Sequence, residues 1–93
     1  MYKIIDSVDL KELEKFGFRK YETSNTYYRK IRRITDGFSS FFEKLEINGN
    51  DRIIRTVLYE DLSDQYWEGN IVRNSRILDL DNAGLIEGVY NES

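Results

Sequence analysis

The chain has 93 residues, a formal net charge of −3, and no histidine, cysteine or proline. Without histidine or cysteine it can form no Ser–His or Cys–His triad, no thiolate nucleophile and no zinc site built from those ligands. The length predicts one domain over residues 1–93, and the 40% hydrophobic share indicates a folded core. We therefore do not expect an enzyme, and we expect neither a cofactor nor a metal ion.

Charge is distributed unevenly along the chain. Residues 1–35 are basic and residues 36–93 are acidic, so a charged partner could meet either half. No apolar stretch is long enough to span a membrane, and the first six residues lack the apolar region of a signal peptide. We therefore expect a cytoplasmic protein that does not enter a membrane.

The first predicted element is a short helix over residues 7–16. Ser7 is the expected N-cap, and Gly17 is the expected left-handed residue after the last turn. Residues 18–21 then have strand character and could join a sheet at its edge.

Three strands follow, joined by two turns with strong hairpin signals. Residues 26–34 are rich in aromatic and β-branched side chains, and the pairs Asp36-Gly37 and Asn48-Gly49 favour tight turns. Between these turns, residues 38–47 alternate, with Phe42, Lys44 and Glu46 expected on one face. Residues 52–59 complete the third strand.

The last third of the chain is less regular. Residues 60–69 are acidic and indicate a helical turn or a structured loop, and residues 74–83 indicate a helix that ends at Gly84. Residues 88–93 are expected to be a frayed tail. The predicted fold class is α+β: an antiparallel meander of three or four strands with one helix before and one after it, packed on one face.

The leading functional hypothesis is a binding module that acts by contact with a larger protein. Tyr66 and Trp67 stand in an acidic setting, and both residue types are frequent in binding hot spots. The alternative for Trp67 is a structural one, covering an end of the core. On a helix, Asp61, Asp64 and Glu68 would share a face, but they match no metal motif, and helix-dipole effects explain acidic residues there. The predicted surface comprises Glu60, Asp61, Asp64, Tyr66, Trp67 and Glu68.

A second hypothesis is a sheet surface that binds nucleic acid, because the strand near residue 30 mixes aromatic rings with cations. Strict alternation would place Tyr27, Arg29 and Arg33 on one face, and Tyr28, Lys30 and Arg32 on the other. Splitting the charge in this way favours a solvated strand paired with Glu43 and Glu46, and the acidic composition also argues against nucleic acid. The predicted nucleic-acid contacts are Tyr27, Tyr28, Arg29, Lys30, Arg32 and Arg33.

Three segments together give the chain a family resemblance: Leu10-x-x-Leu13-x-x-Phe16-Gly17-Phe18, Tyr27-Tyr28-Arg29-Lys30, and Leu80-x-x-Ala83-Gly84-Leu85-Ile86-Glu87. The chain resembles short uncharacterised proteins of low-GC Gram-positive bacteria and their phages, a group with no assigned activity. The resemblance implies a small cytoplasmic accessory protein that occupies a surface on a larger host protein.

A third hypothesis is a homo-oligomer that forms through an exposed strand edge. The strand that ends at Tyr59 or the segment 18–21 would supply that edge.

Overall fold

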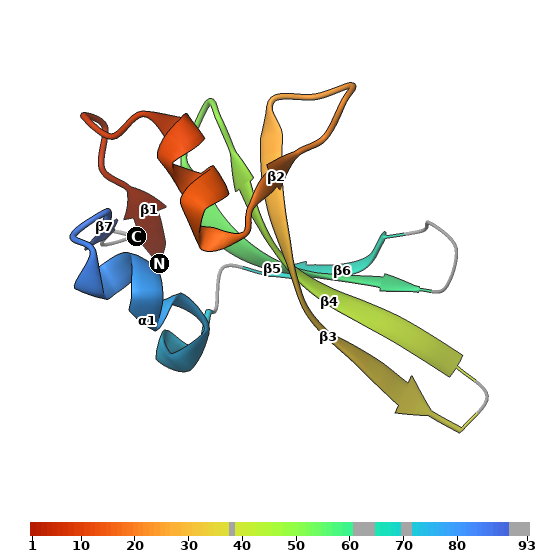
Figure 1. Cartoon of the computed structure of the whole chain (residues 1–93). Helices are drawn as coiled ribbons and strands as arrows, with labels where there is room; N and C mark the ends of the chain where they lie inside the picture. The colour runs from red at the N-terminus through yellow and green to blue at the C-terminus, as the bar shows by residue number, and fades with distance from the viewer. Residues whose placement is uncertain (38, 61–64, 70–71, 90–93) are drawn as a thin grey trace.

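The computed structural model describes residues 1–37, 39–60, 65–69 and 72–89, and these form one sheet with two short helices on it (Figure 1). Its strands and helices, in chain order, are β1 (Tyr2–Ile4), the 3-10 helix η1 (Leu10–Phe16), β2 (Arg19–Lys20), β3 (Thr26–Asp36), β4 (Ser39–Asn48), β5 (Ile53–Glu60), β6 (Gln65–Gly69), α1 (Asn74–Asn82) and β7 (Ile86–Gly88).

The prediction of a three- or four-stranded meander flanked by two helices is wrong. Within the described residues the chain is mostly antiparallel sheet, with seven strands in the order β2-β3-β4-β5-β1-β7 and β6 paired with β5. The element before the meander is a 3-10 helix, and among the described residues only α1 is an α-helix. The extra strands β1 and β7 have three residues each, too short to show an alternating pattern.

The first helix begins later than predicted. Asp9, rather than Ser7, is the N-cap, and its side chain accepts a hydrogen bond from the backbone N–H of Lys11 at 3.0 Å. The predicted end is confirmed, because Gly17 has a φ of 84° and closes the helix with a left-handed turn.

The two predicted hairpins are confirmed, and they organise the sheet. β4 pairs with β3 along its whole length and with β5 from Phe41 to Ile47. The other side of β5 is shared: its first residues pair with β1 and its later residues pair with β6. Residues 65–69 are therefore a strand, and neither the predicted helical turn nor the predicted structured loop.

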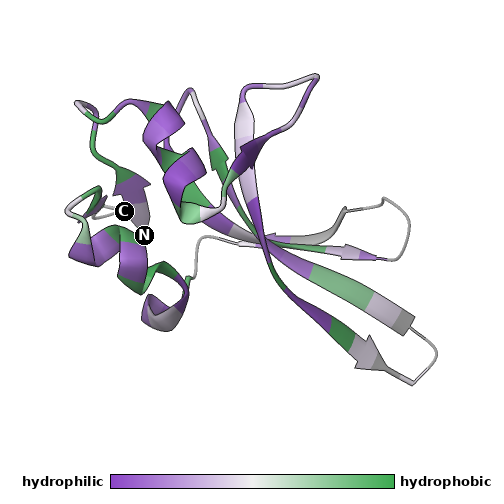
Figure 2. Ribbon diagram, viewed as in Figure 1, coloured by the Kyte–Doolittle hydropathy of each residue, from purple (hydrophilic) through white to green (hydrophobic). Residues whose placement is uncertain are grey.

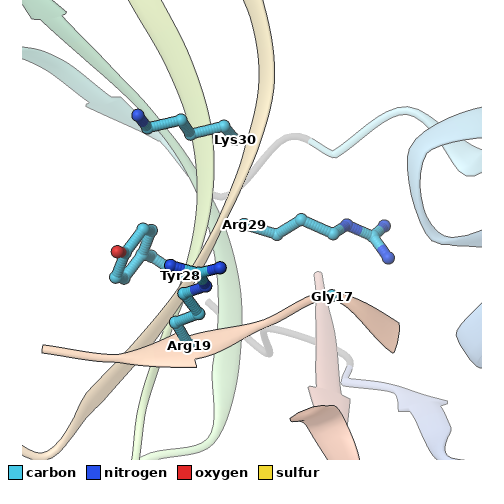
Figure 3. Close-up of a pocket in the computed structure, with 5 residues that line it drawn as sticks. All are labelled: Gly17, Arg19, Tyr28, Arg29 and Lys30. Carbon is cyan, nitrogen blue, oxygen red and sulfur yellow. The ribbon is translucent and has the colours of Figure 1, made fainter. Parts of the chain in front are cut away.

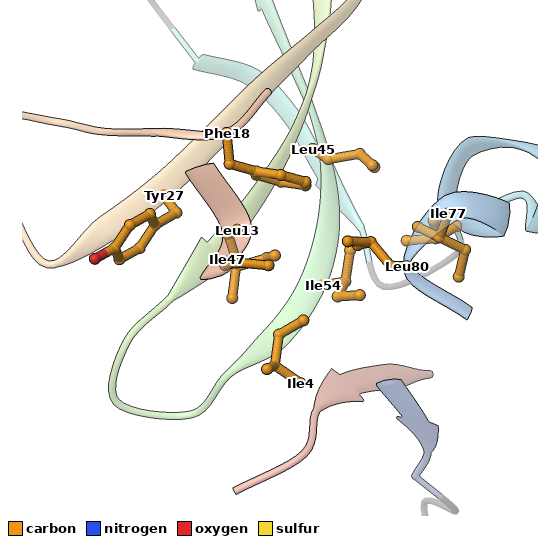
Figure 4. Close-up of a cluster of buried hydrophobic side chains, with 10 residues drawn as sticks. Ile4, Leu13, Phe18, Tyr27, Leu45, Ile47, Ile54, Ile77 and Leu80 are labelled. Atoms are coloured by element: carbon orange, nitrogen blue, oxygen red, sulfur yellow. The ribbon is translucent and has the colours of Figure 1, made fainter. Parts of the chain in front are cut away.

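Both helices pack on the same face of the sheet, here called the helix face. Leu13 of η1 and Leu80 of α1 are fully buried against Ile47 and Ile54 from the sheet (Figure 4). Ile4 of β1 completes this apolar layer, which links the start and the end of the described chain.

The sheet extends beyond the helices. The turn end of the β3–β4 hairpin and the β5–β6 hairpin project away from η1 and α1 (Figure 1). Apolar residues on the strands in Figure 2 are interleaved with hydrophilic ones, as expected for strands that present a different surface on each face. Within the described residues, no helix has the length and apolar character needed to cross a membrane.

A bulge in β3 changes which side chains share a face. The β3–β4 register shifts between Lys30 and Arg32, so Ile31 is an extra residue. As a consequence, Arg32 joins Arg29 on the helix face, and Arg33 joins Lys30 on the opposite face. The predicted strict alternation is wrong from this point onward.

Candidate functional site

The face of the sheet opposite the helices, here called the open face, carries the chemically distinctive side chains. The register aligns Tyr28 with Glu46 and Arg55, and it aligns Lys30 with Lys44. Cross-strand partners share a face in an antiparallel sheet, so these side chains lie on one surface. On β2 to β6, the described charged and aromatic residues of the open face, with Val57 and Tyr21 beside them, are Arg19, Tyr21, Tyr28, Lys30, Arg33, Phe42, Lys44, Glu46, Arg55, Val57, Tyr59 and Glu68.

The centre of the open face is a network of three tyrosines, a lysine and a carboxylate. Lys44 Nζ lies 5.4, 4.9 and 4.7 Å from the ring centroids of Tyr21, Tyr28 and Tyr59. The rings of Tyr21 and Tyr28 stack with centroids 4.3 Å apart. Aromatic stacking and cation–π attraction therefore hold these side chains in one arrangement.

Glu46 is the hydrogen-bond acceptor of this network. Its carboxylate accepts a 2.8 Å hydrogen bond from the Tyr21 hydroxyl, and it also accepts one from the Tyr59 hydroxyl. Lys44 Nζ donates to Tyr21 Oη at 3.3 Å. The polar atoms inside the network are therefore paired, which limits the motion of the tyrosine rings.

Burial and the carboxylate shift the protonation equilibria in the network. Partial burial, together with the hydrogen bond to Glu46, raises the pKa of Tyr59 to about 12. The same two causes raise the pKa of Tyr21. Burial lowers the pKa of Lys44, because the charged ammonium loses hydration. At neutral pH both tyrosines remain protonated donors.

Cations surround the network, and several of them have no acidic partner within the described residues. Arg19 and Lys30 are exposed on either side of Tyr28 (Figure 3). Arg33 lies over the Phe42 ring, 5.6 Å from its centroid, and donates to Ser40 Oγ. At its described positions on β2 to β6 the open face thus carries five cations and two carboxylates, in a chain whose net charge is −3.

The predicted nucleic-acid residues are divided between the two faces. Tyr27 is buried in the core, and Arg29 points to the helix face. Arg32 pairs with Glu43 at 3.3 Å. Only Tyr28, Lys30 and Arg33 lie on the open face.

Arg29 links three elements through one guanidinium. It donates to the carbonyl of Phe16 at 3.0 Å and to the carbonyl of Arg76 at 2.5 Å. It also pairs with Asp79 at 2.7 Å and lies 4.7 Å from the centroid of the Phe18 ring. Arg29 therefore joins η1, β3 and α1.

The predicted acidic surface is described only in part. Glu60 is exposed at the end of β5, and Glu68 is exposed on β6 and lies 3.4 Å from Arg55. Asp61 and Asp64 lie outside the described residues. Tyr66 and Trp67 belong to β6, with Trp67 opposite Leu58, but their side chains are also outside the description. That surface stays a prediction.

The idea of a carboxylate cluster on a helix at residues 61–68 does not agree with the strand β6. Among the described residues, no group of three acidic side chains is placed to hold a metal ion.

Most of the open face could not be predicted from the sequence, because its side chains come from five strands, β2 to β6. Lys44, Glu46 and Phe42 could have been found, since their alternation places them together. Tyr21 and Tyr59 carry no local signal that they would meet at Glu46.

No family model, curated protein or solved structure matches the chain. Its function is therefore inferred from its own residues.

Proposed function

We propose that the protein is a small non-enzymatic binding module that contacts a larger protein through the open face of its sheet. The observation that supports this is the gathering of tyrosine, phenylalanine and arginine on a face that neither helix covers. Tyrosine and arginine are frequent in the residues that dominate protein–protein affinity. An absence of histidine and cysteine agrees with binding rather than catalysis.

The tyrosine network favours a protein partner. Because Tyr21 and Tyr28 stack on each other and Glu46 accepts from two hydroxyl groups, the rings have little freedom to lose on binding. The stack also covers one face of each ring, and Glu46 places a negative charge near the centre. A folded protein surface can complement fixed rings and charges of both signs more readily than a flexible polyanion can.

Charge indicates the character of the partner. Arg19, Lys30 and Arg33 have no carboxylate partner among the described side chains, so an acidic patch on the partner would complement them. The net charge of −3 weakens long-range attraction of nucleic acid, so the positive potential would act only at close range.

Single-stranded nucleic acid is the second candidate, supported by the rings and cations that share the open face. The bulge at Ile31 exchanges Arg32 for Arg33 on the face of Tyr28 and Lys30, and Arg33 has no carboxylate partner among the described residues, whereas Arg32 pairs with Glu43. Such binding should fall steeply with added salt, whereas an aromatic contact with a protein should depend on salt less.

The location and the accessory role that we propose for the protein rest on its resemblance to short proteins of low-GC Gram-positive bacteria and phages. We propose a cytoplasmic accessory protein that occupies a surface of a host protein.

The test is affinity capture of the tagged full chain from a bacterial lysate, with and without nuclease. The open-face variant Arg19→Glu/Phe42→Thr should retain about tenfold less of a nuclease-resistant partner than the wild type does. The control Lys11→Glu/Leu78→Thr likewise reverses one cation and replaces one apolar side chain by threonine, but on the helices, where Lys11 and Leu78 are exposed. It should capture the partner as the wild type does. Equal capture by both variants would contradict the proposal, and material lost on nuclease treatment would favour the second candidate.

A further inference from the structure

Within the part of the chain that the structure describes, one edge of β3 has no neighbouring strand over most of its length. On this side β2 pairs only with Tyr27 and Tyr28. From Arg29 to Asp36, no described strand lies beside β3 on the side away from β4. A strand edge of this kind presents unpaired backbone donors and acceptors.

The backbone at Lys30 is placed to pair with another strand. The Tyr21 N–H donates to the Thr26 carbonyl at 3.0 Å, so Thr26 directs its polar backbone groups toward β2. Every second residue of a strand directs these groups to the same side. Lys30 therefore directs its N–H and C=O toward the open edge, just beyond the end of β2.

Positive side chains follow this edge. Lys30, Arg32 and Arg33 are exposed, and Arg32 alone of the three pairs with a carboxylate, on the helix face. Lysine, arginine and a bulge on an edge strand discourage pairing between identical edges. A second copy presenting its own β3 edge would place this row of cations against itself, so the charge selects an acidic occupant.

A cavity lies beside the first residue of β2, where the open edge of β3 begins. It has a volume of about 350 Å³ and is lined by Gly17, Arg19, Tyr28, Arg29 and Lys30 (Figure 3). Arg29 is already engaged by Asp79, which leaves Arg19 and Lys30 to meet a carboxylate entering the cavity.

We propose that an extended acidic segment of the partner protein adds to the sheet as a strand beside residues 29–36 of β3, with one of its carboxylates between Arg19 and Lys30. Main-chain hydrogen bonds would give this contact its strength, and the cations would select the acidic sequence. The inference rests on the proposed function and names the chemistry of the partner.

The test uses a labelled, end-blocked peptide of alternating glutamate and threonine, eight residues long to match residues 29–36. Fluorescence anisotropy with the wild-type full chain should detect binding. A peptide with lysine in place of glutamate should not bind. The glutamate peptide with alternate amides N-methylated keeps its charge but cannot complete the ladder, and it should bind at least about tenfold more weakly.

Variants locate the peptide on the protein. Lys30→Glu/Arg33→Glu should weaken binding at least about tenfold, whereas the control Lys11→Glu/Arg73→Glu, which reverses two exposed cations away from the edge, should not. Thermal melting checks that both variants fold.

Three results would overturn the inference: no binding of the acidic peptide, equal binding of the N-methylated peptide, or self-association of the wild type that Lys30→Glu/Arg33→Glu abolishes. The proposed function would survive them if Arg19→Glu/Phe42→Thr still lost the captured partner. If that variant kept its partner while the peptide bound the wild type as expected, the proposed function would fail, and so would the assignment of Arg19 to the partner's carboxylate; peptide binding would then stand as a property of the β3 edge alone.

Discussion

At the scale of single residues, the roles of Arg29 and Lys30 show how neighbouring cations in one strand can differ. Arg29 points toward the helices, where its guanidinium donates hydrogen bonds to two carbonyls and pairs with Asp79. Lys30 points to the open face and is exposed. The first is a structural cation, whereas the second is available for binding.

Arg29→Met should therefore lower the free energy of unfolding by about 2 kcal/mol, because it leaves half-buried carbonyls and a carboxylate without their donor. The matched substitution Arg33→Met removes an exposed arginine of the same strand and should cost no more than about 0.5 kcal/mol. Urea denaturation measures both. Equal losses would show that Arg29 does not join the helices to the sheet.

The raised pKa of Tyr59 should make the stability of the fold depend on pH in the alkaline range. Its pKa in the folded chain is raised to about 12, above the value of about 10 for an unfolded tyrosine. The stability that its neutral hydroxyl contributes is then fully present below pH 10 and lost as the pH rises through 12. Tyr59→Phe should flatten the decline in melting temperature between about pH 10 and pH 12, relative to the wild type. An unchanged decline would exclude the link to Glu46.

At the scale of elements, Gly17 fixes how η1 leads into β2. Its φ of 84° is costly for residues with a Cβ, and its N–H bonds the Glu14 carbonyl at 3.2 Å. Gly17→Ala should lower the free energy of unfolding by about 1 kcal/mol. The control Gly88→Ala, at an exposed glycine without a positive φ and with open space around it, should change it far less. Chemical denaturation measures the free energy of unfolding of both variants. Equal losses would show that the positive φ of Gly17 does not matter for the end of η1.

The sequence could predict an element when the interactions that form it join residues close together in the chain, and not when they join distant residues. The turns at Gly37 and Asn48-Gly49 are local, and the hairpins they close were predicted. β1 and β7 pair with each other across almost the whole chain, and three residues carry no pattern that reveals such a partner. The bulge at Ile31 has no residue signal, yet it decides which face Arg32 and Arg33 occupy. The main strands that carry the open face could therefore be predicted from the sequence, but not which of their side chains come together on it.

At the scale of the whole molecule, the fold separates stability from binding. One face holds the apolar core under η1 and α1, and the other holds a fixed network of tyrosines ringed by cations. The β3–β4 and β5–β6 hairpins carry this second face beyond the helices (Figure 1). A partner could contact the open face without disturbing the core.

The most direct test of this account is site-specific photo-crosslinking in cells with benzoylphenylalanine placed at Phe42, at Leu78 or at Trp67. Phe42 lies on the open face, Leu78 is 54% exposed on α1, and Trp67 reports on the predicted acidic segment. If the open face is the binding surface, benzoylphenylalanine at Phe42 should give a nuclease-resistant protein adduct, and benzoylphenylalanine at Leu78 should give none. An adduct from Leu78 or from Trp67 alone, with none from Phe42, would contradict this account.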